Sequence, residues 1–350
     1  MKVLLISAHQ PPLICGIGDY TEILTQNLNS AGIEASHIAL VNDFRPKFFK
    51  GLRVLLKVRE ALSQGHFDLI HLQYEAFSFE QSYLLLLYLT GRQQPLVVTF
   101  HEVFQKTKWQ QRRDRNLFKK SAAVIVNDRG RFDSLLRLLP EAKEKVHCLW
   151  VGSNLPRLER EVSPQKALIG FFGFINGVKR LDILFNSFKI IKNQIPTARL
   201  RLVGAFDSHD LEVKKWRQWA EKEGLAEGIE WCGPQSRELS SQKIQECELM
   251  LLPFSDGASP RRGSLQAGLS LGKALLTSTP VSDEPGLAGL TFIKSTDPKG
   301  WAQQAVSILN NQNLRQALEK KSFEISQKFS WETMAARHLQ IYNQVLAKKK

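Results

Sequence analysis

The chain has 350 residues, a length that suits two domains of about 150 residues better than one core. With 43% hydrophobic and 23% charged residues it has a globular composition, which excludes a disordered, collagen-like or coiled-coil protein. The formal net charge of +14 is compatible with three kinds of anionic partner, namely nucleic acid, anionic lipid and phosphorylated substrates.

Nothing in the sequence predicts export or membrane insertion. The apolar stretch Leu84–Leu89 is far shorter than the ~20 residues that cross a bilayer. The apolar residues after Met1 are ended by Ser7, too early for a signal peptide, so we expect a cytoplasmic protein. The cysteines are too scattered for a disulfide framework or a zinc site, which fits a reducing compartment: Cys15, Cys148, Cys232 and Cys247.

Strand-like and helix-length segments alternate along the first half of the chain. An amphipathic segment from Tyr20 to Ala31, ended by Gly32, predicts a helix. The segment Ser82–Thr90 is apolar nearly all round, so we expect a buried helix there. Short apolar runs predict strands at Val3–Ser7, Glu34–Val41, Leu69–Gln73, Leu96–Phe100 and Ala123–Val126.

The same alternation restarts after Pro156–Pro164, a polar stretch bracketed by prolines that is typical of an interdomain linker. Strands are predicted at Ala167–Phe172, Ala198–Val203, Ile229–Trp231, Leu249–Leu252 and Ala274–Thr277. Helices are predicted at Leu181–Asn193, Asp210–Glu223, from about Ser264, at Trp301–Lys321 and at Trp331–Lys348. Apolar strands separated by helices are typical of parallel sheets covered on both faces, so we predict two doubly wound α/β domains in tandem.

In such sheets ligands bind outside the carboxyl ends of the strands, so motifs there carry the most weight. Two familiar patterns are incomplete. The dinucleotide fingerprint begun by Gly16 and Gly18 has Thr21 at its third glycine position, and the zinc-protease pattern begun by His101 has Gln105 at its second histidine position. No Walker sequence and no Asp-x-Asp pair is present, so no metal site is predicted.

The segment Gly16–Asp19 lies between the first strand and the first helix. Glycines let the backbone approach a ligand, and a helix N-terminus offers unpaired N–H groups and a positive dipole end. Two interpretations are open here, a phosphate or sugar contact and a simple tight turn.

The most informative stretch is Asp256–Ser264, which follows the strand Leu249–Leu252 and precedes a helix. Adjacent arginines, glycines and hydroxyls at a helix start can hold a diphosphate without a metal ion, whereas the bland alternative is a solvated basic loop. We favour the diphosphate site. Its candidate contacts are Gly257, Ser259, Arg261, Arg262, Gly263 and Ser264.

Two other strand ends carry candidate side chains. Lys179 and Arg180 follow the strand Ala167–Phe172 and can reach the same ligand site as the Asp256–Ser264 stretch. His101 ends the strand Leu96–Phe100 at the corresponding place in the first domain, where functional and structural roles for a histidine are equally open.

These motifs resemble those of a GT-B glycosyltransferase of family 4, also called glycosyl transferase group 1, nearly from end to end. The final helix, Trp331–Lys348, resembles the one that crosses back over the N-terminal domain in this family. The other segments that carry the resemblance are Gly16–Thr21, Thr99–Glu102, Gly173–Lys179, Trp231–Gly233, Leu252–Phe254 and Leu271–Ala274.

The chain also departs from the family pattern. Two glutamates separated by seven residues usually contact the donor sugar and ribose, and here those positions are Ser259 and Ala267. The sequence looks like a branch of the family in which Arg261 or Arg262 replaces the missing diphosphate contact. Two further positions differ as well: an arginine is usual at Phe174, and a glycine is usual at Arg180.

The resemblance implies two Rossmann-like domains facing each other across a cleft. Residues 1–160 would form the acceptor domain, residues 165–328 the donor domain, and residues 329–350 a helix packing back on the first domain. It implies transfer of a sugar from a nucleotide-diphosphate sugar to a glycan or lipid-linked acceptor, with retained configuration and without a metal or cofactor. His101 would be catalytic, Asp19 and Glu75 would contact the acceptor, and further donor contacts would be Gly16, Gly18, Gly173, Lys179 and Arg180.

Two basic clusters lie in the first domain, Arg45–Arg59 and Lys106–Lys120, each interleaved with apolar residues such as Phe48, Phe49 and Trp109. Basic helices with apolar faces can lie on anionic membranes, and they can equally be solvated helix surfaces. We see no nucleic-acid-binding module, so no nucleic acid partner is expected.

Two alternatives to an active transferase remain open. A non-catalytic nucleotide-sugar-binding relative acting in a complex is favoured by the loss of both family glutamates. A GT-B-like epimerase or phosphorylase would turn over with water or phosphate and no acceptor.

Overall fold

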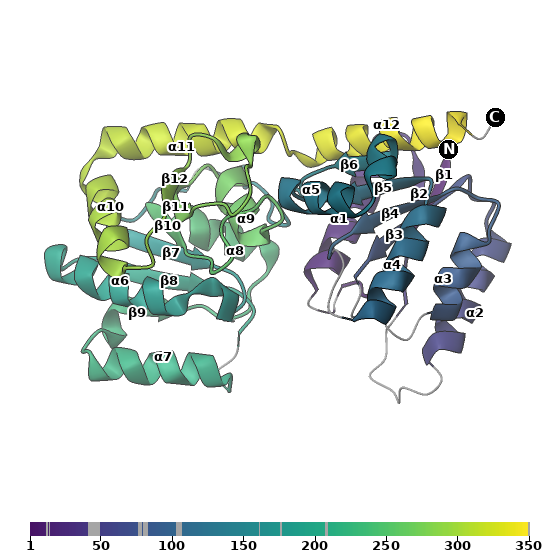
Figure 1. The fold of residues 1–350 in the computed structure, drawn as a ribbon. Helices are drawn as coiled ribbons and strands as arrows, with labels where there is room; N and C mark the ends of the chain where they lie inside the picture. The colour runs from purple at the N-terminus through teal and green to yellow at the C-terminus, as the bar shows by residue number, and fades with distance from the viewer. Residues whose placement is uncertain are drawn as a thin grey trace. The chain divides into compact units, whose positions relative to one another are not determined.

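The computed structural model describes residues 1–11, 13, 15–40, 50–75, 79, 83–102, 107–160, 162–175, 177–206 and 209–348. The chain divides into two compact units, Met1–Gly152 with Trp331–Lys350 (unit 1) and Ser153–Ser330 (unit 2) (Figure 1). Each unit contains a parallel sheet of six strands with helices on both faces, which confirms the prediction of two doubly wound α/β domains.

The sheet of unit 1 has the strand order β2-β1-β3-β4-β5-β6. Its strands are β1 (Lys2–Ser7), β2 (Glu34–Ala39), β3 (Leu69–Tyr74), β4 (Leu96–Phe100), β5 (Ala123–Val126) and β6 (Val146–Cys148). Its helices are α1 (Gly16–Ser30), α2 (Lys50–Gln64), α3 (Tyr83–Thr90), α4 (Lys108–Lys120), α5 (Arg129–Leu138), the 3₁₀ helix η2 (Pro140–Lys145) and α12 (Trp331–Ala347).

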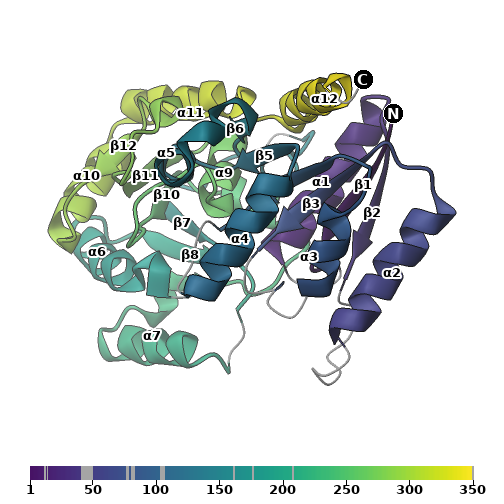
Figure 2. The ribbon, with the colours of Figure 1, turned by 45° about the vertical axis from the view of Figure 1, so that its right-hand side comes forward.

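Alternate strand residues of unit 1 point to opposite faces of the sheet. On one face, Leu4, Ile70 and Val98 belong to a core shared with α2, α3, α4 and α5. Helices α2, α3 and α4 lie side by side over this face (Figure 2). Helix α12 packs against α1, so a helix that follows unit 2 in the sequence completes unit 1.

Helix α3 differs from the expected buried helix. Leu85 and Leu86 are buried, whereas Tyr83, Leu84 and Leu87 are 44%, 52% and 42% exposed. Only one side of a helix can face the sheet. Because this helix is apolar all round, apolar side chains on its other side remain exposed to solvent. One side of the helix is therefore buried and the other exposed, although both sides are apolar in sequence.

The sheet of unit 2 has the order β12-β11-β10-β7-β8-β9. Its strands are β7 (Leu168–Phe172), β8 (Arg199–Val203), β9 (Ile229–Trp231), β10 (Leu249–Leu252), β11 (Ala274–Ser278) and β12 (Thr291–Ile293). Its α-helices are α6 (Leu181–Gln194), α7 (Leu211–Lys222), α8 (Arg237–Gln245), α9 (Gly263–Ser270), α10 (Pro298–Asn310) and α11 (Gln312–Gln327). The 3₁₀ helices are η3 (Gly177–Lys179), η4 (Ala226–Gly228) and η5 (Pro285–Leu287).

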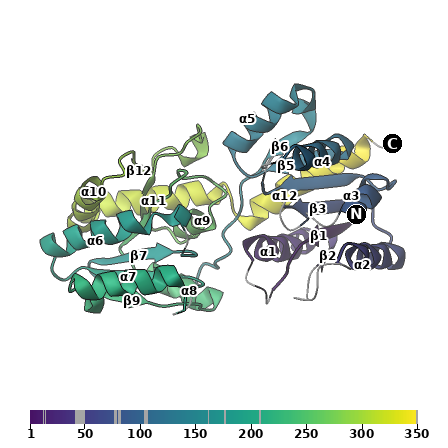
Figure 3. The same cartoon turned by 60° about the horizontal axis from the view of Figure 1, so that its bottom comes forward.

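Helix α10 packs against α6, and α11 packs against α9 (Figure 3). The single helix expected over Trp301–Lys321 is wrong, because α10 and α11 are two helices that meet at Asn311. The Asn311 side chain accepts a hydrogen bond from the backbone N–H of Leu314, an N-cap that starts α11 and ends α10.

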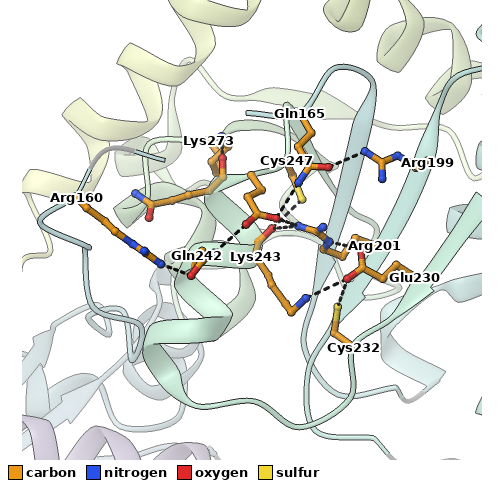
Figure 4. A network of polar contacts seen from close by, with 12 residues as sticks. Arg160, Gln165, Arg199, Arg201, Glu230, Cys232, Gln242, Lys243, Cys247 and Lys273 are labelled. Carbon is orange, nitrogen blue, oxygen red and sulfur yellow. Dashed lines mark hydrogen bonds and ion pairs between the residues drawn. The ribbon is translucent and has the colours of Figure 1, made fainter. Parts of the chain in front are cut away.

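A polar network fixes the amino-terminal side of the unit 2 sheet (Figure 4). The buried guanidinium of Arg201 lies 2.6 Å from the carboxylate of Glu230 and 2.5 Å from that of Glu246. Lys243 lies 3.0 Å from the second oxygen of Glu230, and hydrogen bonds from Arg201 and Lys243 hold the pKa of that carboxyl near 2 against the opposing effect of burial. The strand ends that carry this network are opposite to those that carry the candidate motifs, so we assign it a structural role.

Candidate functional site

The loops that follow β7 and β10 are tied together at the carboxyl edge of the unit 2 sheet. The backbone N–H of Ser255 donates to the carbonyl of Val178 at 3.0 Å. The Lys179 ammonium donates to the hydroxyl of Ser264 at 2.6 Å, and both residues are buried. The motifs from two distant parts of unit 2 therefore form one site, with a lysine held against the first turn of α9.

Phe254 contacts two of the cations of this site. Its ring centre is 4.6 Å from Lys179 Nζ and 5.0 Å from the guanidinium carbon of Arg262, within the range of cation–π contacts. Arg262 also pairs with the carboxylate of Asp256, and Arg261 pairs with its other oxygen at 2.9 Å. Two arginines thus pair with the same carboxylate and Lys179 lies close by, a concentration of positive charge suited to a phosphate group.

The environment of Lys179 makes its charge sensitive to pH. Burial, together with the neighbouring charges of Arg262 and Arg261, lowers its pKa to about 7, while Asp256 acts in the opposite direction. A bound anion would stabilise the ammonium form of Lys179, because a nearby negative charge favours the charged state of the lysine.

Close backbone packing shapes the floor of the site at two glycines. Gly204 follows β8 with φ +155°, and a Cβ there would lie 2.1 Å from the carbonyl oxygen of Gly173. A Cβ on Gly173 itself would lie 3.2 Å from Lys179 Nζ. A side chain at Gly204 therefore cannot be accommodated without moving the loop that carries the lysine.

The other predicted donor residues lie in the same loops. Arg180 is the N-cap residue of α6 and has a left-handed conformation, and its guanidinium donates to Asp182 at 2.8 and 2.7 Å. Gly257 lies next to the backbone of Thr279. Ser259 is buried. Gly263 is the first residue of α9, so the positive end of the helix dipole lies beside it.

In unit 1, His101 follows β4 and is held by a chain of buried side chains. Its Nε2 lies 2.9 Å from Oε1 of Gln73. The Gln73 amide nitrogen lies 3.2 Å from Nε2 of His71, whose Nδ1 lies 2.6 Å from the hydroxyl of Tyr342. Because an amide oxygen only accepts, Nε2 of His101 carries its proton and Nδ1 holds the lone pair.

The charge state of His101 follows from its surroundings. Burial, with a smaller effect from the positive charge of Arg131, lowers its pKa to about 3. The ring is therefore neutral at physiological pH, and it can accept a hydrogen bond at Nδ1. Tyr20 contacts it edge-on, at 5.7 Å between ring centres, and also contacts Trp331 at the start of α12.

The remaining unit 1 candidates lie at the start of α1 and directly after β3. Gly18 has no room for a side chain, since a Cβ would lie 2.8 Å from the carbonyl oxygen of His9, whereas the space beside Gly16 is open. Asp19 lies in the first turn of α1, where its carboxylate faces the positive end of the helix dipole. Glu75 directly follows β3 and is half-buried.

Sequence reasoning missed several residues that shape the site, including Gln73, His71, Tyr342 and Gly204, and it did not predict that Asp256 pairs with the site arginines. The first two alternate in the otherwise apolar strand Leu69–Tyr74, and such polar residues in a buried strand were a usable signal. The contribution of Tyr342 had no such signal, because it depends on how α12 docks.

Among the described residues, no three His, Cys, Asp or Glu side chains gather in an arrangement that could hold a metal ion. In the same ranges no helix combines the length and apolar character needed to cross a membrane.

Comparison with known proteins places this geometry in a family. Residues 18–155 match the profile described as Glycosyltransferase Family 4, and residues 166–311 match the one described as Glycosyl transferases group 1. The D-inositol 3-phosphate glycosyltransferase of Jonesia denitrificans is 22% identical over 255 residues, which are 65% of this chain and 58% of that relative. The match thus spans little more than half of that relative's length.

Solved structures with low sequence identity share the fold. Sucrose-phosphate synthase from Thermosynechococcus elongatus has a TM-score of 0.78 at 15% identity, covering 99% of this chain and 100% of that one. Anabaena HepE in complex with UDP and glucose has 0.74 at 14%, covering 98% and 100%. The catalytic domain of starch synthase IV from Arabidopsis thaliana, bound to ADP and acarbose, has 0.72 at 12%, covering 99% of each. With the two profile matches together spanning most of its length, the chain belongs to the family 4 (group 1) glycosyltransferases of the GT-B fold.

Proposed function

We propose that the protein transfers a sugar from a nucleotide-diphosphate sugar to a glycan or lipid-linked acceptor, with retention of configuration and without a metal ion. The observation that carries this proposal is the cation cluster at the carboxyl edge of the unit 2 sheet, where Lys179 and Arg262 contact Phe254 while Arg261 and Arg262 pair with Asp256. Two structural neighbours support a nucleotide donor, since HepE is bound to UDP and starch synthase IV to ADP.

The chemical demand of the reaction falls on the departing diphosphate. When the bond between the anomeric carbon and the diphosphate oxygen breaks, negative charge grows on that oxygen. Lys179, Arg261 and Arg262 supply positive charge there, and the N-terminus of α9 adds oriented N–H groups from Gly263 onward. Gly173 and Gly257 allow the backbone to approach the phosphates, and Ser259 and Ser264 add hydroxyl contacts.

The acceptor side is assigned to unit 1. A neutral His101 contacts the donor sugar through Nδ1, and its fixed tautomer prevents it from donating there. Asp19 and Glu75 bind acceptor hydroxyls, while Gly16 and Gly18 let the start of α1 approach the ligand. Arg180 provides a peripheral charge, because Asp182 already engages its guanidinium.

A screen of nucleotide-diphosphate sugars tests this function directly. The protein is incubated with each donor, and thermal stabilisation and slow hydrolysis to the nucleoside diphosphate are measured. One donor should raise the melting temperature and be hydrolysed. If none of the nucleotide-diphosphate sugars stabilised the protein, the assignment of a donor site to unit 2 would be wrong.

A second function is favoured by a specific observation, the presence of Ser259 and Ala267 where the family has glutamates. A buried alanine in α9 cannot contact a ribose hydroxyl, so the protein would bind a nucleotide sugar without turnover and act in a complex. Donor binding without transfer to any acceptor or to water would support this alternative. Turnover with water or phosphate alone would instead favour an epimerase or phosphorylase.

A further inference from the structure

A surface cavity of about 490 Å³ lies on unit 1, between α3 and α4. Four of its lining side chains are cationic and none is acidic among those that the structure describes there. The lining residues are Tyr83, Arg112, Arg113, Arg115, Asn116 and Lys119.

One of the cationic residues of this cavity, Arg113, is held in place by buried contacts. Arg113 is buried, lies 3.3 Å from the carboxylate of Asp114, and stacks at 5.5 Å on the ring of Tyr74. The Tyr74 hydroxyl donates to the same carboxylate at 2.5 Å. Asp114 is fully buried and engaged by these two partners, so it does not offset the charge of the outer residues. In the described part of the chain, no carboxylate pairs with Arg112, Arg115 or Lys119.

Exposed apolar side chains lie on the helices beside this cavity. Among described residues of unit 1, the large hydrophobic side chains that are exposed all lie on α2 or α3: Leu52, Leu56, Tyr83, Leu84 and Leu87, each 42–52% exposed. Helix α3 contacts both α2 and α4 (Figure 2). Leucines spaced by four residues on α2 and by three on α3 form stripes that face away from the core.

Basic residues accompany the leucines on α2. Arg53 and Arg59 are exposed, and Lys57 reaches back to the carbonyl of Ala39 at 2.6 Å. The face formed by α2, α3 and α4 thus combines cations with exposed leucines, and we call it the α2–α4 face. Of the two basic clusters considered from the sequence, Arg45, Lys47, Phe48, Phe49 and Lys106 lie outside the described residues.

We propose that the α2–α4 face binds the surface of an anionic phospholipid membrane, with a lipid phosphate in the cavity and the leucines in the interface. Arginine guanidinium groups match phosphate oxygens in geometry and charge. A soluble phosphate would need the cavity alone, whereas a bilayer also removes the exposed leucines from water. The coincidence of both features on neighbouring helices favours the lipid surface.

Vesicle sedimentation tests the proposal on the full-length protein. Binding is measured to phosphatidylcholine vesicles with and without 30% phosphatidylglycerol, at ~0.05 and ~0.5 M salt, where screening lengths differ severalfold. We expect binding to anionic vesicles at least tenfold tighter than to neutral ones at low salt, and lost at high salt. Equal or absent binding to both vesicles would overturn the proposal.

Two variants and their matched controls locate the surface. Arg112→Gln with Arg115→Gln and Lys119→Gln should weaken binding at least tenfold, and Leu84→Ser with Leu87→Ser at least threefold. Arg113 is kept, because removing it would leave Asp114 buried without its cation. The controls remove three cations and one leucine elsewhere: Lys214→Gln with Lys222→Gln and Lys320→Gln, and Leu211→Ser, all at exposed positions of unit 2. Equal losses in controls and variants would overturn the assignment to this face.

A soluble competitor separates the two sources of phosphate. Glycerol 3-phosphate at millimolar concentration should leave vesicle binding nearly unchanged. If it stabilised the protein through the cavity arginines while the protein did not sediment with anionic vesicles, the site would be one for a soluble phosphate and the membrane proposal would fail. The readouts involve no sugar transfer, so they stand or fall independently of the proposed function.

Discussion

The hydroxyl of Tyr342 lies 2.6 Å from Nδ1 of His71, although 271 residues separate them in the sequence. This contact joins α12 to the central strand β3 of unit 1. From His71 the chain of polar contacts continues through Gln73 to His101. The last helix of the protein therefore supports the proposed catalytic histidine as well as covering the sheet.

Changing Tyr342 to Phe should reduce the free energy of unfolding of unit 1 by about 1–3 kcal/mol, because Nδ1 of the buried His71 ring loses its hydrogen-bond partner. Denaturant melts followed by circular dichroism measure this. Tyr88→Phe serves as the control, since its hydroxyl only accepts a partly exposed bond from Arg92. Equal stability of the Tyr342 variant and the native protein would show that α12 docks through apolar contacts alone.

Replacing both Arg261 and Arg262 by Ala should weaken nucleoside-diphosphate binding at least tenfold while leaving the fold intact. Hydrogen bonds to charged groups contribute about 1.5–3 kcal/mol each, and part of this is offset because Asp256 competes for the same guanidinium groups. Titration calorimetry gives the affinity. Unchanged binding in the double variant would exclude these arginines from the site.

The pH dependence of donor binding should report on Lys179. With a pKa near 7 in the free protein, the lysine is charged below that pH and increasingly neutral above it, so its attraction for a diphosphate falls as the pH rises from 6 to 8.5. Affinities of the native protein and of Lys179→Met should converge over this range, with Lys214→Met as the control. A constant ratio of the two affinities would contradict this prediction.

Gly204→Ala should displace the loop after β7, because its Cβ would lie 2.1 Å from the carbonyl oxygen of Gly173. We expect a lower melting temperature and donor binding weakened at least tenfold. Gly224→Ala is the control for backbone strain, since Gly224 also has positive φ (+66°) but has open space around it. If both variants bind donor equally, the close approach at Gly204 does not shape the site.

Turnover should survive a strong chelator, since clustered cations supply the charge that a magnesium ion would otherwise provide. The rate is measured with and without millimolar EDTA, after dialysis. Activity that disappears with EDTA and returns with magnesium or manganese would contradict a metal-independent transfer.

Local sequence determined most of the fold. Strands such as Leu96–Phe100 and Leu249–Leu252 are almost entirely apolar and are buried at every position, which only a sheet covered on both faces allows. The position of the candidate motifs could be predicted as well, because the carboxyl ends of parallel strands lie at the same edge of each sheet. Asn311 shows the limit of periodicity, since a single capping side chain divided one predicted helix into two.

Tertiary structure alone decided which side chains meet. Asp256 pairs with both site arginines, and Lys179 reaches Ser264 across 85 residues, because the loops after β7 and β10 are adjacent in the sheet. The exposed side of α3 and the support of His101 by α12 have the same origin. A sequence pattern records how apolar a segment is, but the packing of neighbouring elements decides which of its faces is covered.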